Sequence, residues 1–264
     1  MLANVIERPD EAAEFLSLYW KDGKCPISAQ VKKGLASIFS KFNEYQLAKH
    51  DYSGSAISLR DVMFLSHPRP ETVEQEELFA RIANGKLKTP DTWEVALSAG
   101  ADKAEVFTRL MQQKKLGSSA FLRNMRNMVQ SGVSLELIDE YAKVVNTERE
   151  LPFRFITAYK HVPAVLHPSL QMMMLRCMMG MDKLDGHTLL LVDVSGSMYN
   201  MAIAAKSEMK RSDAAAALAI LAREICTKAT IATFSNNLVV LGNSRGFDLV
   251  GDIHKSQGHG GTNF

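Results

Sequence analysis

The apolar residues of the first 182 positions repeat with a helical period, and this region carries no strand signal. Ser28 can cap a helix, and one face of that helix would hold Val31, Leu35, Ile38, Phe39 and Phe42. Glycines and prolines divide the region into helices of about 10–15 residues with short links, which predicts stacked helix pairs in an α-solenoid. A compact bundle is the alternative, because the sequence shows no longer repeat that would mark successive helix pairs.

Two further segments show the signature of a helix start. Asp91-x-x-Glu94 and Asp102-x-x-Glu105 resemble capping boxes, with Asp in place of the usual Ser or Thr. We therefore expect Asp91 and Asp102 to cap the helices that follow them.

The pattern changes after residue 185. Thr188–Asp193 is a short apolar run that ends in a carboxylate, and it predicts a strand buried on both faces, as in parallel α/β sheets. An Ala-rich helix is predicted over Ala214–Cys226, and strands over Ala229–Phe234 and Leu238–Leu241. This order of elements predicts a Rossmann-like α/β domain after the helical region.

Three oxygen-bearing side chains follow the first predicted strand. Asp193, Ser195 and Ser197 lie just past its carboxyl end, the edge where open α/β sheets bind ligands. One carboxylate with two hydroxyls suits a hard divalent cation, Mg²⁺ first and Mn²⁺ or Ca²⁺ next. The alternative is a Ser-rich turn that only caps the next helix.

Asp-x-Ser-x-Ser, the helix and strands after it, and the later Gly260-Gly261-Thr262 together resemble a known metal site. It is the metal-ion-dependent adhesion site (MIDAS) of von Willebrand factor A domains. The resemblance implies that Thr262 joins Asp193, Ser195 and Ser197 as a ligand of Mg²⁺, or of another divalent cation such as Mn²⁺. It predicts a partial von Willebrand factor A domain over residues 186–264, whose C-terminal half, with a completing Asp, is expected to be missing.

Five segments of the remaining chain match another family. They are Asn43–Lys49, Leu59–Pro70, Ser119–Met125, Leu151–Phe155 and Pro168–Gln171. Together they resemble the TROVE module of Ro ribonucleoproteins, in particular the bacterial Ro-like branch, in which an A-type domain follows directly. The resemblance covers most of residues 28–264 and predicts HEAT-like helical repeats over residues 1–182, with further N-terminal repeats expected to be missing.

The resemblance implies an RNA-binding function. Ro-type proteins are helical rings closed by the A domain; they bind small noncoding Y RNAs outside and single-stranded ends of misfolded RNAs in the hole. Some also assist exoribonucleases. We therefore expect a Y-like RNA, single-stranded RNA ends and an exoribonuclease as partners, with no DNA. The alternative is a metal-dependent protein-docking module on a helical scaffold with no RNA role.

Local charge indicates where RNA would bind, because a net charge of +2 decides little. Residues 21–70 and residues 101–130 each carry four more basic than acidic side chains, and such clusters neutralise phosphates. The candidate RNA contacts are Lys49, Arg60, His67, Arg69, Arg123 and Arg126. The resemblance singles out His67, which aligns with a TROVE histidine implicated in RNA contact. The alternative is that these residues are ordinary solvated helix faces.

Several other classes are disfavoured by the sequence. Ser195 lacks the Gly-x-Ser-x-Gly elbow of hydrolases, and Gly258–Gly261 lacks the Gly-Lys-Ser/Thr of a phosphate-binding loop, so we expect no enzyme. No apolar stretch reaches the roughly 18 residues needed to span a membrane. The three cysteines are odd in number and far apart, so we expect buried thiols in a reducing cytoplasm.

Overall fold

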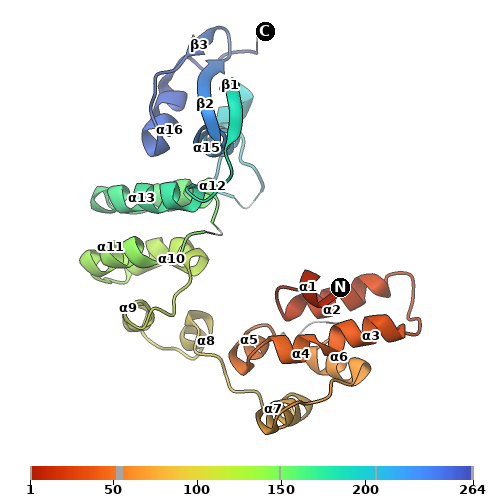
Figure 1. Ribbon diagram of the computed structural model, residues 1–264. Helices are drawn as coiled ribbons and strands as arrows, with labels where there is room; N and C mark the ends of the chain where they lie inside the picture. The colour runs from red at the N-terminus through yellow and green to blue at the C-terminus, as the bar shows by residue number, and fades with distance from the viewer. Residues whose placement is uncertain (1, 52–55, 149, 206, 263–264) are drawn as a thin grey trace. The chain divides into compact units, whose positions relative to one another are not determined.

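The computed structural model describes residues 2–51, 56–148, 150–205 and 207–262 (Figure 1). The chain divides by packing into two compact units, Met1–Val95 and Ala96–Phe264. This division falls inside the predicted helical region, so the predicted domain boundary near residue 184 stays a prediction.

The described residues of the first unit form helices joined by turns and loops, with no strand among them. Its helices are α1 (Leu2–Val5), α2 (Asp10–Tyr19), α3 (Ala29–Ala36), α4 (Ile38–Lys41), α5 (Glu44–Lys49), α6 (Leu59–Ser66) and α7 (Val73–Ala83). Helix α8 (Trp93–Ser98) crosses the division between the units.

The predicted helix after Ser28 exists, but it is divided. The Ser28 hydroxyl accepts a hydrogen bond from the Val31 amide, as expected of an N-cap. The helix breaks at Ser37, whose hydroxyl donates to the Gly34 carbonyl at 2.7 Å. Its predicted inner face is nevertheless correct, because Leu35, Ile38 and Phe39 are buried.

The core of the first unit forms where α2, α3, α6 and α7 bring their apolar faces together. Phe39 and Phe79 meet there edge to face, with ring centroids 5.9 Å apart. Next to this core, Arg81 donates two hydrogen bonds to Glu44, at 2.9 and 3.1 Å, and so ties α7 to α5.

The second unit begins with stacked helices. They are α9 (Lys103–Gln112), α10 (Ser118–Gln130), α11 (Leu135–Val144), α12 (Pro152–Tyr159), the 3₁₀ turn η1 (Ala164–Leu166) and α13 (His167–Met178). Helices α10 and α11 form one layer, and α12 and α13 form the next (Figure 1). Such layers of helix pairs are the arrangement expected of a solenoid.

The caps of two helices test the predicted starts. Asp102 caps α9 by accepting from the Glu105 amide at 2.9 Å, which confirms the prediction. Helix α8 begins at Trp93, and the Thr92 hydroxyl accepts from the Val95 amide. The prediction of Asp91 as the cap was therefore wrong by one residue.

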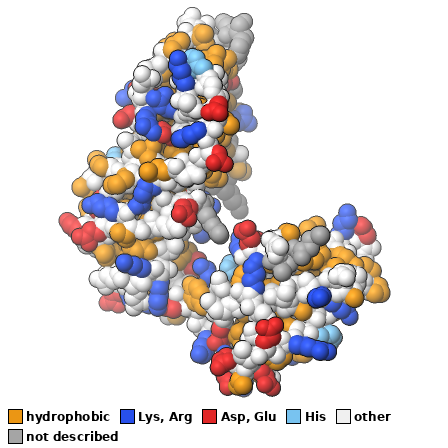
Figure 2. All heavy atoms as spheres, in the orientation of Figure 1, with side chains coloured by type: hydrophobic (Ala, Val, Ile, Leu, Met, Phe, Trp, Pro, Cys, Tyr) orange, Lys and Arg blue, Asp and Glu red, His pale blue; other side chains and the backbone are white. Residues whose placement is uncertain are grey.

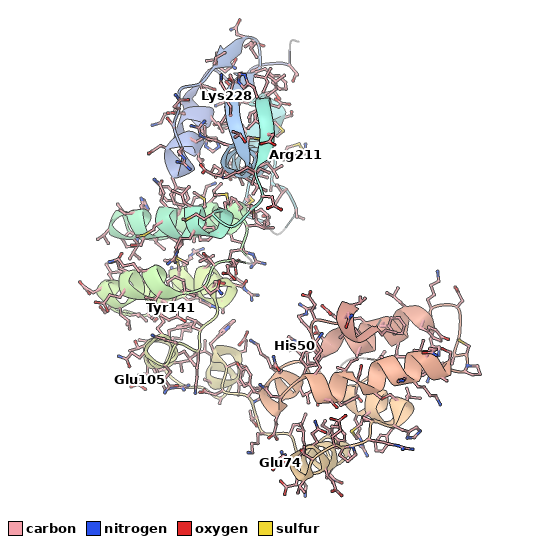
Figure 3. The ribbon with its side chains drawn as sticks, in the orientation of Figure 1. His50, Glu74, Glu105, Tyr141, Arg211 and Lys228 are labelled. Carbon is pink, nitrogen blue, oxygen red and sulfur yellow. The ribbon has the colours of Figure 1, made fainter. Side chains whose placement is uncertain are left out.

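Tyr141 of α11 joins these layers to the preceding loop, and its side chain is labelled in Figure 3. It is buried, packs edge to face on Phe121 with centroids 5.3 Å apart, and donates to the Leu116 carbonyl. The hydroxyl therefore keeps a hydrogen-bond partner inside the core.

The rest of the second unit is a three-stranded mixed sheet with helices. Its elements are β1 (Leu184–Asp193), α14 (Gly196–Asn200), α15 (Arg211–Ile225), β2 (Cys226–Phe234), β3 (Leu238–Val240) and α16 (Gly246–Lys255). β1 and β2 are parallel and joined through α15, and β3 returns antiparallel beside β2. All three predicted strands exist at the predicted places, with β1 and β2 starting earlier.

The prediction that the first strand is buried on both faces was wrong. Along β1, Leu189 and Leu191 are 59% and 42% exposed, whereas Val192 is buried. Leu238 and Val240 of β3 are also exposed and lie on the same sheet face as Leu191 by the strand register. Helix α15 packs on the two longer strands, so among the described residues one face of the sheet is covered and the other is open.

A buried carboxylate joins the stacked helices to the sheet region. Asp213, at the start of α15, is 1% exposed and accepts from the Lys160 ammonium at 2.5 Å. The Lys210 amide also donates to it at 2.9 Å, and the Nε2 atom of His254 lies 3.8 Å away. A carboxylate this deeply buried requires such partners.

Apolar and backbone contacts reinforce this junction. The Tyr159 ring lies between His167 and Phe247, at centroid distances of 3.8 and 4.2 Å. Gly246 has a positive φ of 59°, and an added Cβ would lie 2.9 Å from the side chain of Gln171. Gln171 in turn accepts from the Phe247 amide at 3.1 Å. Glycine suits this position because it adopts the positive φ without strain, whereas a side chain would also displace the end of Gln171.

Two of the three cysteines are buried, as predicted. Cys177 and Cys226 are buried free thiols, and burial raises the pKa of Cys177 to about 11. Cys25 is exposed, so the prediction of a buried thiol there was wrong. No helix in the described part of the chain is both long and apolar enough to cross a membrane.

Replacing Lys160 with Met should lower the free energy of unfolding by about 2 kcal/mol, because it leaves the buried Asp213 carboxylate without its ammonium partner. The value is discounted because the Lys160 side chain is 41% exposed. Urea denaturation measures the change. The matched control is Lys143→Met, which removes a more exposed i, i+4 partner of Asp139 and should lower the free energy of unfolding much less. Equal losses in the two variants would show that the Asp213 pair is no more important than a surface pair.

Candidate metal centre and RNA-contacting surfaces

Three of the predicted metal ligands come together at the carboxyl end of β1. The Asp193 carboxylate accepts from the Ser195 amide at 2.8 Å. The hydroxyl oxygens of Ser195 and Ser197 are 3.2 Å apart. Ser195 is 2% exposed and precedes α14, whereas Ser197 is exposed. The turn therefore holds the three oxygen-bearing side chains at one edge of the sheet.

The segment that leads to Thr262 lies against this turn. The Gly196 amide donates to the Gly260 carbonyl at 3.0 Å. Ser235, just after β2, donates to the Gly261 carbonyl and accepts from the Gly260 amide, both at 3.0 Å. Thr262 follows directly and is exposed. The structure thus brings its segment to the predicted site, as the combined motif suggested.

Aromatic residues support this edge from one side. His259 contacts the Val194 carbonyl through Nδ1 at 2.9 Å, and its ring stacks on Tyr199 with centroids 3.4 Å apart. Tyr199 donates to the His254 carbonyl at 2.9 Å. Burial and the charge of Asp213 raise the pKa of Tyr199 to about 12, so it remains a donor. Burial also lowers the pKa of His254.

The donor set fits a small hard cation. Two ligands about 2.1 Å from an octahedral ion at right angles lie about 3 Å apart, and the Ser195 and Ser197 oxygens are 3.2 Å apart. No cluster of three His, Cys, Asp or Glu side chains suited to a metal occurs among the described residues. Any ion here would therefore depend on hydroxyl oxygens and the single carboxylate of Asp193.

In the first unit, the RNA candidates Arg60 and His67 lie on and at the end of α6. Ser58 caps this helix in a reciprocal capping box with Asp61, and the hydrogen bonds from Ser58 lower the pKa of Asp61. Arg60 lies over the exposed ring of Phe64, 5.4 Å from its centroid. Arg60, Phe64 and His67 are spaced i, i+4 and i+7, and all three are exposed, so they share one helix face.

His67 ends α6 in a strained backbone conformation. Its φ of 52° is left-handed, which a side-chain-bearing residue rarely adopts, and its amide donates to the Met63 carbonyl at 2.9 Å. Arg69 follows on the exposed turn after Pro68. Lys49 is exposed on another helix, α5, with its ammonium 5.9 Å from the Tyr45 ring centroid. Whether these residues act on one surface stays a prediction.

In the second unit, Arg123 and Arg126 of α10 line a groove against α12. The groove has a volume of about 290 Å³, and α12 with the turn after it contributes Phe153, Arg154 and His161. These three residues were not predicted as site residues from the sequence. Leu151–Phe155 showed only a family resemblance, and the signal that could have identified the groove was Phe153 on the polar side of a helix.

On the face shown in Figure 2, basic and acidic side chains are interspersed on each unit. Charge therefore singles out no region by itself, and the groove is distinguished by its shape and its aromatic lining.

Comparison with known families identifies part of the chain. The TROVE domain family matches residues 83–211. This match confirms the predicted resemblance to the TROVE family over residues 83–211. The matched range includes Arg123, Arg126 and the Asp193–Ser197 turn, whereas Lys49, Arg60, His67 and Arg69 lie outside it.

Two curated proteins are similar to a short part of the chain. Telomerase protein component 1 of Mus musculus is 37% identical over 83 residues, which is 29% of this chain and 3% of that protein. The protein of the same name from Rattus norvegicus is 38% identical over 80 residues, again 3% of its length. The chain thus spans a very small part of these relatives.

One solved structure resembles nearly the whole chain. The crystal structure of the Deinococcus radiodurans Ro (Rsr) protein has a TM-score of 0.67 and covers 96% of this chain and 62% of its own. The sequence identity is 16%, so this likeness shows the fold. It agrees with the helix-rich architecture and small mixed sheet described above.

Replacing His67 with Gly should raise the free energy of unfolding by up to about 1 kcal/mol, because glycine adopts the left-handed conformation without strain. His67→Asn should change it by about 0.5 kcal/mol or less, because Asn tolerates the same conformation. Urea denaturation of both variants measures this. A loss above about 1 kcal/mol in both would mean that the imidazole packs in the fold and is not available to a ligand.

Proposed function

We propose that this protein is an RNA-binding component of a Ro-like ribonucleoprotein. The TROVE domain over residues 83–211 carries this proposal. It is supported by the basic groove between α10 and α12, which lies inside the matched range. The proposed role is to scaffold RNA processing or quality control, a binding function and not a catalytic one, in the cytoplasm.

Two kinds of RNA are proposed for two surfaces. A small structured RNA of Y-like type would contact Lys49, Arg60, His67 and Arg69 in the first unit. Single-stranded ends of misfolded RNAs would contact Arg123 and Arg126 in the second unit. Guanidinium groups suit both roles because they bind phosphate through two donors and stack on bases. An exoribonuclease is the proposed protein partner, and no DNA is expected.

We also propose that Asp193, Ser195, Ser197 and Thr262 bind Mg²⁺, or another divalent cation such as Mn²⁺, in a partial von Willebrand factor A domain over residues 186–264. The 3.2 Å spacing of the serine hydroxyls supports this proposal. The bound ion would supply a positive charge with an open coordination position. An acidic group of a partner could occupy that position.

Replacing Arg60 and Arg69 together with Ala should reduce the salt dependence of binding to a small hairpin RNA. Each lost phosphate contact lowers the slope of log affinity against log salt by about 0.7 to 0.9, so the slope should fall by roughly 1.4 to 1.8. Affinity measured across a salt series tests this.

Lys86→Ala with Lys88→Ala is the matched control, because both lysines are exposed in the same unit but lie outside the proposed surface. An unchanged slope with wild-type affinity in the Arg60 and Arg69 variant would move the structured-RNA surface elsewhere. Failure of the wild-type protein to retain any RNA would favour the alternative, a metal-dependent protein-docking module.

Replacing Asp193 with Asn should weaken Mg²⁺ and Mn²⁺ binding by about tenfold or more, because it removes the only charged ligand proposed for the ion. Isothermal titration calorimetry measures the affinity. Asp185→Asn is the control, since this exposed carboxylate lies on the same strand, β1, away from the site. Identical isotherms for Asp193→Asn and the wild type would remove the metal from the proposal.

A further inference from the structure

We propose that the groove between α10 and α12 is a subsite for one nucleotide of a single-stranded RNA end, and that Glu208 occupies the phosphate position when RNA is absent. This inference rests on the proposed RNA-binding function and extends it to a particular subsite and its internal competitor.

The groove has the lining of a nucleotide site. The Phe153 side chain is 37% exposed, whereas Phe155, two residues later on the same helix, is fully buried. An aromatic ring left at a groove wall beside cationic side chains is the arrangement on which bases of single strands stack. The groove has a volume of about 290 Å³, at the small end of the range for ligand sites. This size fits a single nucleotide of an RNA strand.

Cationic groups surround this ring from two helices. Arg123 and Arg126 come from α10, and Arg154 comes from α12. Arg154 is 3.4 Å from the buried Glu150 carboxylate, which fixes its place at the wall. Among the described residues Arg123 has no ion-pair partner, so its guanidinium remains available to a phosphate.

A carboxylate already binds two of the groups in the groove. Glu208, from the loop between α14 and α15, has one oxygen 2.7 Å from Nε2 of His161 and the other 3.4 Å from Nη1 of Arg126. Its own side chain is 66% exposed, so burial does not hold it there. An anion bridging a guanidinium and an imidazole has the charge and donor pattern of an RNA phosphate.

These observations favour RNA over an acidic protein segment. An acidic peptide would use the cations but would gain little from an exposed aromatic face, whereas every nucleotide supplies both a phosphate and a stacking base. Single strands are also the form whose bases can be splayed onto protein side chains. Because Glu208 already contacts His161 and Arg126, an RNA phosphate must displace it to bind at these two groups.

The experiment measures binding of a short fluorescent oligouridylate to the full chain across a salt series. Phe153→Ala should weaken binding by about tenfold with the salt slope unchanged, since stacking is lost but no phosphate contact is. Phe153→Leu should show a similar loss while preserving apolar packing, which protects the test against misfolding. Arg126→Gln should reduce the slope by about 0.7.

Glu208→Gln should strengthen oligouridylate binding by about two- to fivefold, because exposed ion pairs of this kind are weak competitors. Glu105→Gln, on the exposed surface of α9 and labelled in Figure 3, is the matched charge control. Met172→Ala, an exposed apolar residue on α13, is the control for Phe153. Both controls should bind as the wild type does.

The outcomes separate the two proposals. If the wild type binds neither oligouridylate nor a hairpin RNA, the proposed function fails. If it binds RNA but the Phe153 and Arg126 variants match the controls, the subsite is overturned and the function stands. A weaker complex with Glu208→Gln would show that Glu208 positions the cations and does not compete. If polyglutamate displaces oligouridylate from the groove and Phe153→Ala affects neither ligand, the groove belongs to an acidic protein.

Discussion

The second unit depends on one buried charge. Asp213 has almost no contact with water, so its carboxylate is tolerated only where Lys160 and the Lys210 amide reach it. This requirement places the end of α12 against the start of α15. The groove residue His161 follows Lys160 directly, and the loop that carries Glu208 ends at Lys210. The pairing of Asp213 with Lys160 and Lys210 therefore positions both His161 and Glu208 at the groove.

Much of the fold follows from local rules that a sequence displays. Ser28 and Asp102 cap helices as predicted, and the strands begin and end near their predicted residues, because capping side chains and apolar runs act over a few neighbours. The exposure of Leu189 could not be predicted, because burial depends on which layers cover the sheet. The break at Ser37 was also missed, since a continuous apolar face does not require a continuous helix.

The candidate sites also differ in how far neighbouring residues in the sequence reveal them. The candidate metal site could be predicted because Asp193, Ser195 and Ser197 are adjacent in the sequence at the end of a predicted strand, and the Gly260 segment completed the motif. Only one side of the groove, on α10, was predicted from the sequence. Arg123 and Arg126 stood out by charge, but Phe153 and His161 belong to another helix, and nothing in their local pattern indicates which partner they face. Contacts between layers, such as the bridge from Glu208, exist only after the helices have packed.

The contacts around Asp213 also connect the two proposed sites. From Lys160, beside the groove, they lead through Asp213 and His254 to Tyr199, which stacks on His259 beside the candidate metal site. If this route has two discrete arrangements, binding at one end changes affinity at the other. Thermodynamic linkage then makes the effect reciprocal: whatever factor an ion contributes to RNA affinity, RNA contributes to ion affinity. The amount of RNA in the cell would then set how much of the protein holds metal, and the concentration of the ion would set how firmly RNA ends are retained.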